Sequence, residues 1–200
     1  MTAPLLAARL THTYPGLTLD ASVTAAAGSV VALLGPSGAG KTTCLRMLAG
    51  LVPDAGPGTH ITVGADVWQE GSKGRPPEQR RVGLVLADPL LFPHLSVLEN
   101  VAFGLTSRGL GKAPALERAR RELALVGLAD RATERPSNLS TGQAARVALA
   151  RALAVDPALL LLDEPLSALD PVTRSGLRAA LAGRLRTFEG ATILVTHDPL

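Results

Sequence analysis

The sequence predicts an α/β fold in which helices wrap a mostly parallel β-sheet. Two observations carry this prediction: short strand-like runs alternate with helical patterns along the 200-residue chain, and a glycine-rich loop joins an apolar strand to a helix. A third observation is the loss of strand patterns between Ser96 and Ala154, which predicts an inserted helical subdomain. We therefore divide the chain into a first core part over residues 1–95, a helical subdomain over 96–154 and a second core part over 155–200.

The strand predictions fall into two groups. Near the N-terminus, residues 5–13 and 61–67 carry β-like patterns on either side of the turn-rich segment 53–58, and these strands could be antiparallel. The candidate strands of the parallel sheet follow from short apolar runs, and those at 29–34 and 159–162 are apolar enough to be buried on both faces. These candidates are 29–34, 82–86, 159–162 and 193–195.

The helix predictions rest on spacing and on capping residues. Leu45, Leu48 and Ala49 have helical spacing in the segment 41–50. Ser96 with Glu99, and Ser140 with Gln143, fit capping boxes, in which each serine and the acidic or amide residue three positions later satisfy N–H groups at a helix start. Asp170-Pro171 has the residues of another helix start, with Asp170 as the cap.

Composition excludes several classes of protein. An apolar fraction of 46% is ample for a buried core and excludes a disordered chain. The longest aliphatic run, 158–162, is far too short to cross a bilayer, and we expect a cytosolic protein that reaches a membrane only through a partner. The single cysteine, Cys44, cannot form an internal disulfide, and we expect it to be buried.

Charge and aromatic content argue against a nucleic-acid partner. The net charge is only +3, and Arg118, Arg120 and Arg121 are diluted by Glu117 and Glu122 on what should be one solvated helix. Aromatic side chains that could stack on single-stranded bases are scarce. We expect no nucleic-acid binding.

The loop before the helix at 41–50 fits the phosphate-binding pattern of Gly, four residues, then Gly-Lys-Ser/Thr. Glycines let successive N–H groups turn toward a phosphate, and the following helix directs the positive end of its dipole at the same anion. Lys41 would reach the terminal phosphates of a nucleoside triphosphate, and the Thr42 hydroxyl would ligate Mg²⁺. We expect ATP and Mg²⁺ as cofactors, and the candidate contacts are Gly35, Pro36, Ser37, Gly38, Ala39, Gly40, Lys41, Thr42 and Thr43.

A second element of phosphate chemistry stands at the end of the apolar run 159–162, where Asp163 and Glu164 follow. Magnesium bound to phosphate oxygens prefers a hard anionic partner, so Asp163 is a candidate metal ligand together with Thr42. Glu164 would act as general base toward the attacking water, or orient it. An acidic turn after a strand is common in α/β proteins, but after a phosphate loop the catalytic interpretation is favoured.

Three further motifs appear in an order and spacing that resemble a known family. With them the chain is similar, over nearly its whole length, to the nucleotide-binding subunits of ATP-binding cassette (ABC) transporters, which implies a P-loop NTPase fold of the ABC ATPase type. The motifs are Leu139–Gln143, which resembles the family's signature, Ser167–Asp170, which resembles the loop after the metal-binding strand, and Thr196–Asp198, which resembles the histidine switch.

The resemblance implies a second copy of the chain as a partner. In the family, two subunits meet head to tail, and the signature of one caps the γ-phosphate held by the other. The residues implied to take part at this seam are Ser140, Thr141, Gly142, Gln143 and Asp170. Thr141 stands where glycine is usual, but it keeps its backbone N–H.

Two more positions follow from the resemblance. His197 would hydrogen-bond the γ-phosphate, which makes the expected catalytic set Lys41, Glu164 and His197. Tyr14 is placed like the aromatic residue that stacks on adenine, although it could equally be a strand residue on a half-exposed sheet.

The segment 91–105 is similar to bacterial importers of oxyanions, ferric iron, polyamines and sugars, and with Val67-Trp68 it most resembles the molybdate importers. The resemblance implies an ATP-hydrolysing subunit at the cytoplasmic face of the inner membrane, where it energises integral membrane permease subunits and, indirectly, a periplasmic substrate-binding protein. Molybdate or a related oxyanion is the expected cargo, and ferric iron, polyamine or sugar are the alternatives.

One departure concerns Ala87, which stands where the family has a glutamine whose amide contacts Mg²⁺ and the attacking water. Alanine offers neither donor nor acceptor, so we expect nucleotide binding to persist while hydrolysis or its coupling to transport is weakened. An alternative function is therefore a nucleotide-gated dimerising subunit with weak or no hydrolysis, against which Glu164 argues. A soluble member acting on ribosomes or in DNA repair is disfavoured, because no second cassette or long coiled-coil insertion is present.

A second departure is length. The chain stops three residues after His197, where relatives continue, which fits either a fragment of a longer protein or a naturally short one. If the chain is complete, we expect an uncovered sheet face near 193–195, and in either case we expect no regulatory domain within this sequence.

Overall fold

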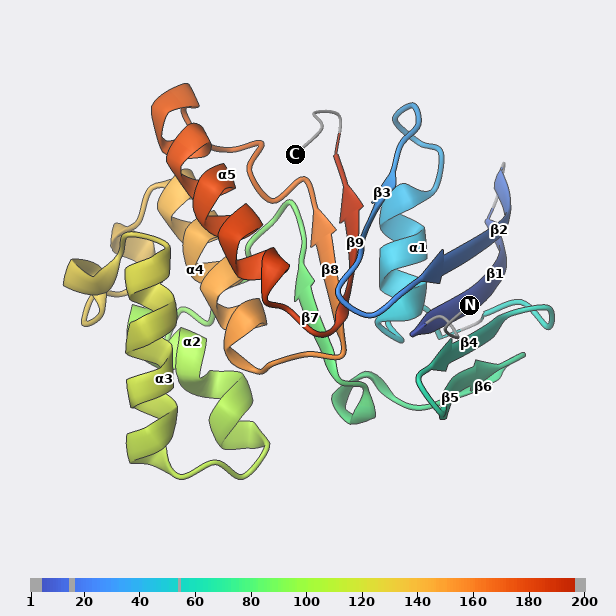
Figure 1. Cartoon of the computed structure of the whole chain (residues 1–200), viewed down its shortest axis with the longest axis horizontal. Coiled ribbons are helices and arrows are strands. Elements are labelled where there is room, and N and C mark those ends of the chain that lie inside the picture. Colours follow the sequence, from blue (N-terminus) through green and yellow to red (C-terminus); the bar gives the residue numbers. More distant parts are fainter. Residues whose placement is uncertain (1–4, 15–16, 54, 197–200) are drawn as a thin grey trace. The chain divides into compact units, whose positions relative to one another are not determined.

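Two β-sheets organise the computed structural model, which describes residues 5–14, 17–53 and 55–196 (Figure 1). The five-stranded sheet has the order β2-β1-β4-β5-β6, and neighbouring strands are antiparallel. The four-stranded sheet has the order β3-β9-β8-β7, with β9 parallel to both β3 and β8. The strands are β1 (Leu6–Tyr14), β2 (Leu17–Ala25), β3 (Val30–Leu33), β4 (His60–Val63), β5 (Asp66–Glu70), β6 (Lys73–Gly74), β7 (Val82–Val85), β8 (Leu159–Asp163) and β9 (Ala191–Val195).

The described residues form both α-helices and short 3-10 turns. The α-helices are α1 (Lys41–Leu48), α2 (Val97–Ser107), α3 (Lys112–Leu125), α4 (Thr141–Ala154) and α5 (Pro171–Arg186), and single 3-10 turns occur at 77–79, 129–131 and 136–138. None of the helices in the described part of the chain has the length and apolar character that a bilayer crossing requires. The mixed α/β architecture, with antiparallel strands near the N-terminus and a parallel sheet, confirms the predicted fold class.

The described residues divide into two units. The first comprises those within 1–84, 158–163 and 187–199, and the second comprises 85–157 and 164–186. The division of the chain at residues 95 and 154 that the sequence suggested stays a prediction.

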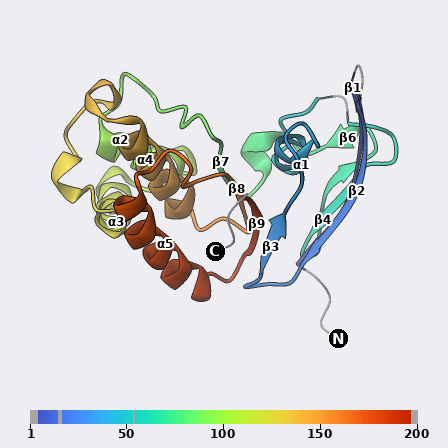
Figure 2. The same ribbon diagram turned by 90° about the horizontal axis from the view of Figure 1, so that it is seen from above.

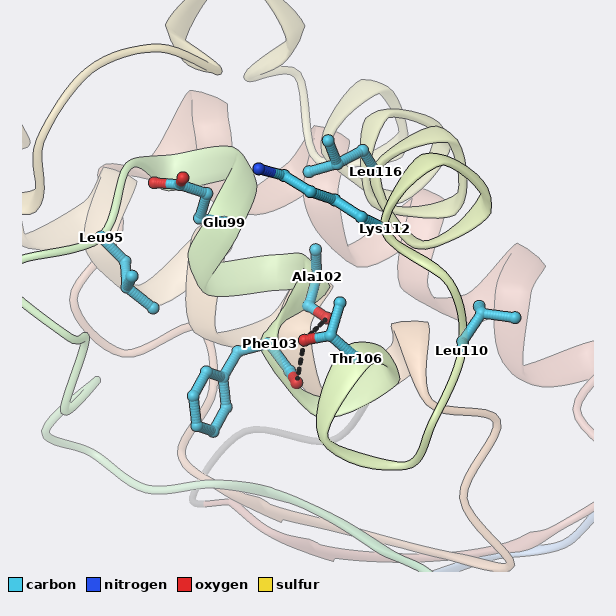
Figure 3. A pocket seen from close by; sticks show the side chains of 8 residues that line it. All are labelled: Leu95, Glu99, Ala102, Phe103, Thr106, Leu110, Lys112 and Leu116. Atoms are coloured by element: carbon cyan, nitrogen blue, oxygen red, sulfur yellow. Dashed lines mark hydrogen bonds between the residues drawn. The ribbon is translucent and has the colours of Figure 1, made fainter.

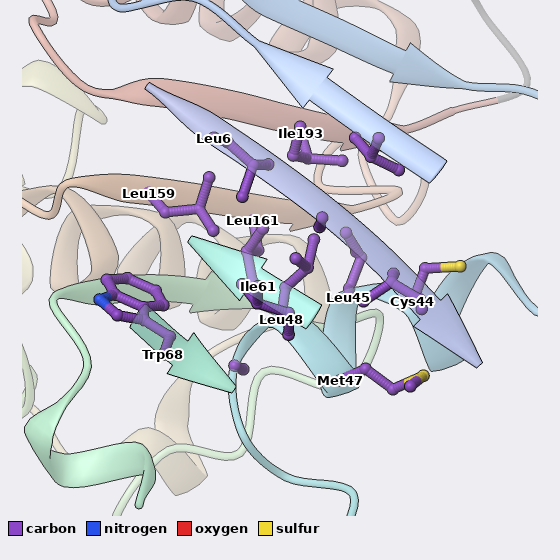
Figure 4. Packing of buried hydrophobic residues seen from close by; sticks show 14 of the residues in the cluster. Leu6, Cys44, Leu45, Met47, Leu48, Ile61, Trp68, Leu159, Leu161 and Ile193 are labelled. Atoms are coloured by element: carbon purple, nitrogen blue, oxygen red, sulfur yellow. The ribbon is translucent and has the colours of Figure 1, made fainter. Parts of the chain in front are cut away.

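In the first unit, α1 lies between the two sheets (Figure 2). Its buried face, which includes Leu45 and Leu48, meets Leu6 and Ile61 from one sheet and strands β8 and β9 from the other (Figure 4). The side chains at the centre of this core are fully buried. Burial of aliphatic side chains from both sheets on one helix fixes α1, and with it the loop that precedes the helix, on a rigid support.

In the second unit, α2, α3 and α4 pack on one another. Both predicted capping boxes are present, because Ser96 Oγ accepts from Glu99 N at 3.2 Å and Ser140 Oγ accepts from Gln143 N at 3.3 Å. The helix predicted at Asp170-Pro171 is α5, and Asp170 Oδ1 accepts from Thr173 N at 3.0 Å.

Four expectations about strands and exposure were wrong in detail. The strand predicted at 61–67 is two antiparallel strands, β4 and β5, and β2 was missed. The strand at 29–34 is not buried on both faces, because β3 is an edge strand of its sheet and Val30 is 42% exposed. Conversely, β9 lies between β3 and β8 and is buried along its whole length, so the face near 193–195 is covered.

The fourth correction concerns α3, which is not simply a solvated helix. Glu122 is only 3% exposed, and its Oε1 accepts from Arg118 Nε at 3.0 Å. Arg118 and Arg184 both bond Asp156 at 3.1 Å, so two arginines and two carboxylates form one cluster. Burial of Glu122 is tolerated because these cations compensate its charge.

Candidate nucleotide-binding site

The loop at 35–42 has the backbone conformation that only glycine adopts readily. Gly38 and Gly40 have φ angles of 81° and 85°, and Gly40 is the residue directly before α1. A Cβ atom at either position would strain the backbone. No side chain caps the start of α1, so its first-turn N–H groups face the loop without a capping oxygen.

Lys41 is folded back onto this loop. Its Nζ donates to Gly35 O and to Pro36 O, both at 2.8 Å. The carbonyls of Gly35 and Pro36 therefore hold the Lys41 ammonium against the loop. Phosphate oxygens could replace these carbonyls as acceptors. The positive charge and the start of a helix lie together, which suits an anion.

The predicted metal pair is in direct contact. Thr42 Oγ1, in the first turn of α1, donates to Asp163 Oδ2 at 2.7 Å, although the two residues are 121 positions apart in the chain. Asp163 ends β8 and is 5% exposed. A hydroxyl and a carboxylate are hard oxygen ligands of the kind Mg²⁺ prefers, so the residues present fit the ion that the sequence implied.

Glu164 follows Asp163 directly and has a strained backbone. Its φ angle is 48°, which is uncommon for a residue with a side chain. Its carbonyl oxygen accepts from Ser167 N at 3.1 Å and from Ser167 Oγ at 2.9 Å, so a local turn supports this conformation. Strain of this kind is found often at functional positions.

The signature-like residues and the segment 167–170 lie side by side in the second unit. A Cβ atom built on Gly142 would come within 3.0 Å of Leu169 Cδ2 and 3.4 Å of Ala168 O. Glycine at position 142 therefore lets the first turn of α4 approach this segment closely. The hydrogen bonds of Asp170 with Thr173 lower the pKa of the Asp170 carboxyl, so the charged form that caps α5 is favoured.

The roles of three other positions stay predictions, and the structure describes the surroundings of two of them. Tyr14 ends β1, is 38% exposed, and packs edge-on against the His12 ring at a centroid distance of 4.1 Å. Ala87 is exposed in the bend after β7. His197 lies outside the described residues.

Arg80 supports the site in a way that the sequence did not predict. Its side chain is buried, and Nη1 donates to Met47 O and Leu48 O, both at 3.0 Å, at the C-terminal end of α1. Both carbonyls belong to the last turn of α1, where the helix does not supply its usual donor four residues later, and Met47 O also accepts from Gly50 N at 3.0 Å. Because a buried arginine has no periodic signature, only the three-dimensional structure reveals this support.

A groove on the second unit also has no sequence signal (Figure 3). It has a volume of about 400 Å³ between α2 and α3, with mostly apolar walls and the charged side chains of Glu99 and Lys112. Its lining residues are Leu95, Glu99, Ala102, Phe103, Thr106, Leu110, Lys112 and Leu116.

Comparison with known proteins agrees with the motifs. The ABC transporter family model matches residues 19–167. The chain is 47% identical over 189 residues to a molybdenum import ATP-binding protein of Mycobacterium tuberculosis (strain H37Rv), which covers 91% of this chain and 50% of the relative.

Two other relatives are similar to the same degree. An Fe(3+) ions import ATP-binding protein of Agrobacterium fabrum is 48% identical over 181 residues, covering 90% of this chain and 49% of its own length. A sulfate/thiosulfate import ATP-binding protein of Chromobacterium violaceum is 49% identical over 180 residues, which cover 90% of this chain and 47% of that protein. The chain thus spans about half the length of the curated relatives it matches. With its phosphate loop, its Thr42–Asp163 contact and these matches, the chain belongs to the ABC transporter family.

Proposed function

We propose that this chain is the ATP-binding and ATP-hydrolysing subunit of an ABC importer. The observation that carries the proposal is the hydrogen bond of 2.7 Å between Thr42 and Asp163, which joins the phosphate loop to the acidic strand end. Separate from each other, a glycine-rich loop and an acidic turn are common. In contact, they provide an anion site beside two hard oxygen ligands.

The roles of the residues follow from their chemistry. Lys41 exchanges its bonds to Gly35 O and Pro36 O for phosphate oxygens of ATP. Thr42 and Asp163 would hold Mg²⁺, which neutralises phosphate charge when it is bound. Glu164 orients the attacking water and accepts its proton, and His197 is proposed to hydrogen-bond the γ-phosphate.

The subunit is proposed to act as a head-to-tail pair with a second copy. A phosphate held by one copy would meet Ser140–Gln143 of the other, and Asp170 would help to join the halves. The contact of Gly142 with Leu169 and Ala168 supports this arrangement, because it puts the two motifs on one surface of the second unit. The pair would sit on integral membrane permease subunits at the cytoplasmic face of the inner membrane, next to a periplasmic binding protein on the opposite side.

Molybdate or a related oxyanion is the proposed cargo. The support is the similarity of 91–105 and Val67-Trp68 to molybdate importers, together with relatives that import molybdenum and sulfate. Ferric iron, which another relative imports, is the first alternative. Uptake of labelled molybdate, sulfate and ferric iron by cells with and without this chain distinguishes these cargoes, and a loss confined to ferric iron would reject the oxyanion.

A second candidate function is a nucleotide-gated dimerising subunit with little turnover, which Ala87 favours. Ala87→Gln separates the two. If the missing amide limits turnover, the substitution raises the ATPase rate of the assembled transporter, whereas an unchanged rate and coupling would mean that position 87 does not limit either.

The proposal is tested by nucleotide retention and turnover. Equilibrium dialysis with labelled ATP and Mg²⁺ should show binding that Asp163→Asn weakens about tenfold or more, through the lost metal ligand. Glu164→Gln should keep binding but abolish single-turnover hydrolysis. Glu117→Gln, an exposed change on α3, is the control for loss of one negative charge. Wild-type protein that retains no ATP would reject the function.

A further inference from the structure

Arg151, in the last turn of α4, bonds the loop that follows Ala87. Its Nη1 donates to Leu90 O at 3.0 Å, and its Nη2 donates to Pro89 O at 2.9 Å. The guanidinium carbon also lies 5.5 Å from the centre of the Phe92 ring. One side chain of α4 thus contacts three of the five residues in the loop 88–92, with two hydrogen bonds and one cation–π contact.

Asn100, on α2, also bonds this loop. This residue is fully buried, and its Oδ1 accepts from Phe92 N at 2.8 Å while its Nδ2 donates to Phe92 O at 3.1 Å. The Phe92 ring lies 4.4 Å from the ring of Phe103, which projects from α2 beside the groove (Figure 3). Asn100 therefore fixes the backbone of Phe92, and Phe103 packs against its ring.

The backbone at Leu90 shows that the loop is constrained. Its φ angle is 45°, in the left-handed region, and its side chain is 60% exposed, so burial of the leucine does not explain the conformation. A residue in this conformation is strained and persists only where its surroundings determine it. The bond from Arg151 to the carbonyl of Leu90 itself is a direct restraint of this kind.

Helix α4 begins at the signature-like residues. Ser140 caps it and Arg151 stands 11 positions later, which is about 16 Å along a continuous helix. A helix transmits a displacement along its axis with little deformation. The guanidinium bonds, made in the planar fork geometry of arginine, then pass the displacement to the loop.

We propose that Arg151 is a positioning residue that makes the loop 88–92 move together with α4, so that contact of nucleotide with the start of α4 also repositions the chain at Ala87. The inference rests on the proposed function, because it explains how nucleotide contact at the start of α4 would displace the backbone at Ala87. Because Ala87 has no side-chain amide, a displacement of the loop can act at position 87 only through the backbone.

The test compares three variants of the full chain. Arg151→Met keeps the length of the side chain but removes the bonds, and Arg151→Lys keeps one charged donor. Arg146→Met is the matched control, because Arg146 is also on α4 and also bonds a carbonyl, that of Val126 at 3.0 Å, but outside this loop.

Kinetics give the first readout. For Arg151→Met we expect kcat for MgATP to fall about tenfold through misplacement of the loop, with KM within about twofold. Arg151→Lys should recover part of the loss, and Arg146→Met should stay within about twofold of the wild type. Equal losses in Arg151→Met and Arg146→Met, or a KM that rises with the fall in kcat, would overturn the inference in favour of general destabilisation.

Hydrogen exchange gives the second readout. In the wild type, MgATP should slow exchange in peptides covering both 140–144 and 88–92, while in Arg151→Met only 140–144 should respond. If both segments still respond in that variant, the link through Arg151 is rejected although the proposed function stands. If the wild type neither binds nor hydrolyses MgATP, the proposed function fails and the inference fails with it. Should Arg151→Met not fold, Arg151→Lys carries the same comparison.

Discussion

Removal of the Arg80 guanidinium should destabilise the first unit by about 3 kcal/mol. The side chain is 2% exposed and donates to Met47 O, Leu48 O, Trp68 O, Gln69 Oε1 and Arg75 O at distances of 2.6–3.2 Å. Replacement by methionine leaves these acceptors without this donor, at about 1 kcal/mol for each bond.

Part of this loss is recovered. Burial removes water from the guanidinium and lowers the pKa of Arg80, and an apolar side chain at this position would not carry that desolvation cost. A net loss of about 3 kcal/mol is left, equivalent to a fall in Tm of roughly 6–12 °C for a chain of this length.

Urea unfolding of Arg80→Met and of Arg80→Lys measures the effect. The lysine variant should fall between wild type and Arg80→Met, because a single ammonium cannot reach all five acceptors. Arg120→Met, an exposed change on α3, should stay within about 0.5 kcal/mol of wild type. If Arg80→Met loses less than about 1 kcal/mol, the carbonyls at the end of α1 do not depend on Arg80 and the reasoning is wrong.

Other expected outcomes follow from single contacts. Burial raises the pKa of the Cys44 thiol, so alkylation by a maleimide at pH 8 should be slow in the folded chain and fast in denaturant; rapid mass gain without denaturant would contradict this. Hydrogen bonds from Ser96 lower the pKa of Glu99, so its stabilising contribution is fully present above the usual glutamate pKa of about 4.3 and is lost as pH falls through the lowered value. The Tm difference between wild type and Glu99→Gln should therefore shrink as the pH is lowered below about 4.3, and a constant difference would contradict this. A Cβ at Gly190 would lie 2.7 Å from Ala158 O, so Gly190→Ala should destabilise by about 1–3 kcal/mol in urea, and an unchanged midpoint would refute the clash.

Local patterns were sufficient for the parts of the site made by consecutive residues. The loop before α1, the capping boxes of α2 and α4, and the aliphatic run of β8 each carry their own physical cause in a short stretch of sequence. The chain order of these elements also predicted the parallel sheet. The roles of the individual site residues stay predictions, and the contact between Thr42 and Asp163 is what supports them most directly.

Local patterns failed where long-range neighbours decide. In β2, buried Leu19, Val23 and Ala25 alternate with less buried residues, so the segment carries a strand signal although no strand was predicted there. Whether β3 is central or at an edge depends on which strand continues the sheet, and no residue of β3 records that. Similarly, the burial of Glu122 depends in part on Arg184, a cation from another element whose Nη2 lies 4.0 Å from Glu122 Oε1.

The two proposed phosphate contacts differ in how their helices begin. At Gly40 no side chain caps α1, whereas at Ser140 the capping box already uses the N–H groups of Ser140 and Gln143. A phosphate that arrives at α4 therefore meets the N–H groups of Thr141 and Gly142, which the box does not use, unless it displaces the cap. Threonine at position 141 leaves that N–H in place, and Gly142 is required by the close approach to Leu169 rather than by the phosphate. An uncapped helix start suits an enclosed anion and a capped one suits an anion that touches it from outside, which is the asymmetry that the proposed sharing of one nucleotide between two copies requires.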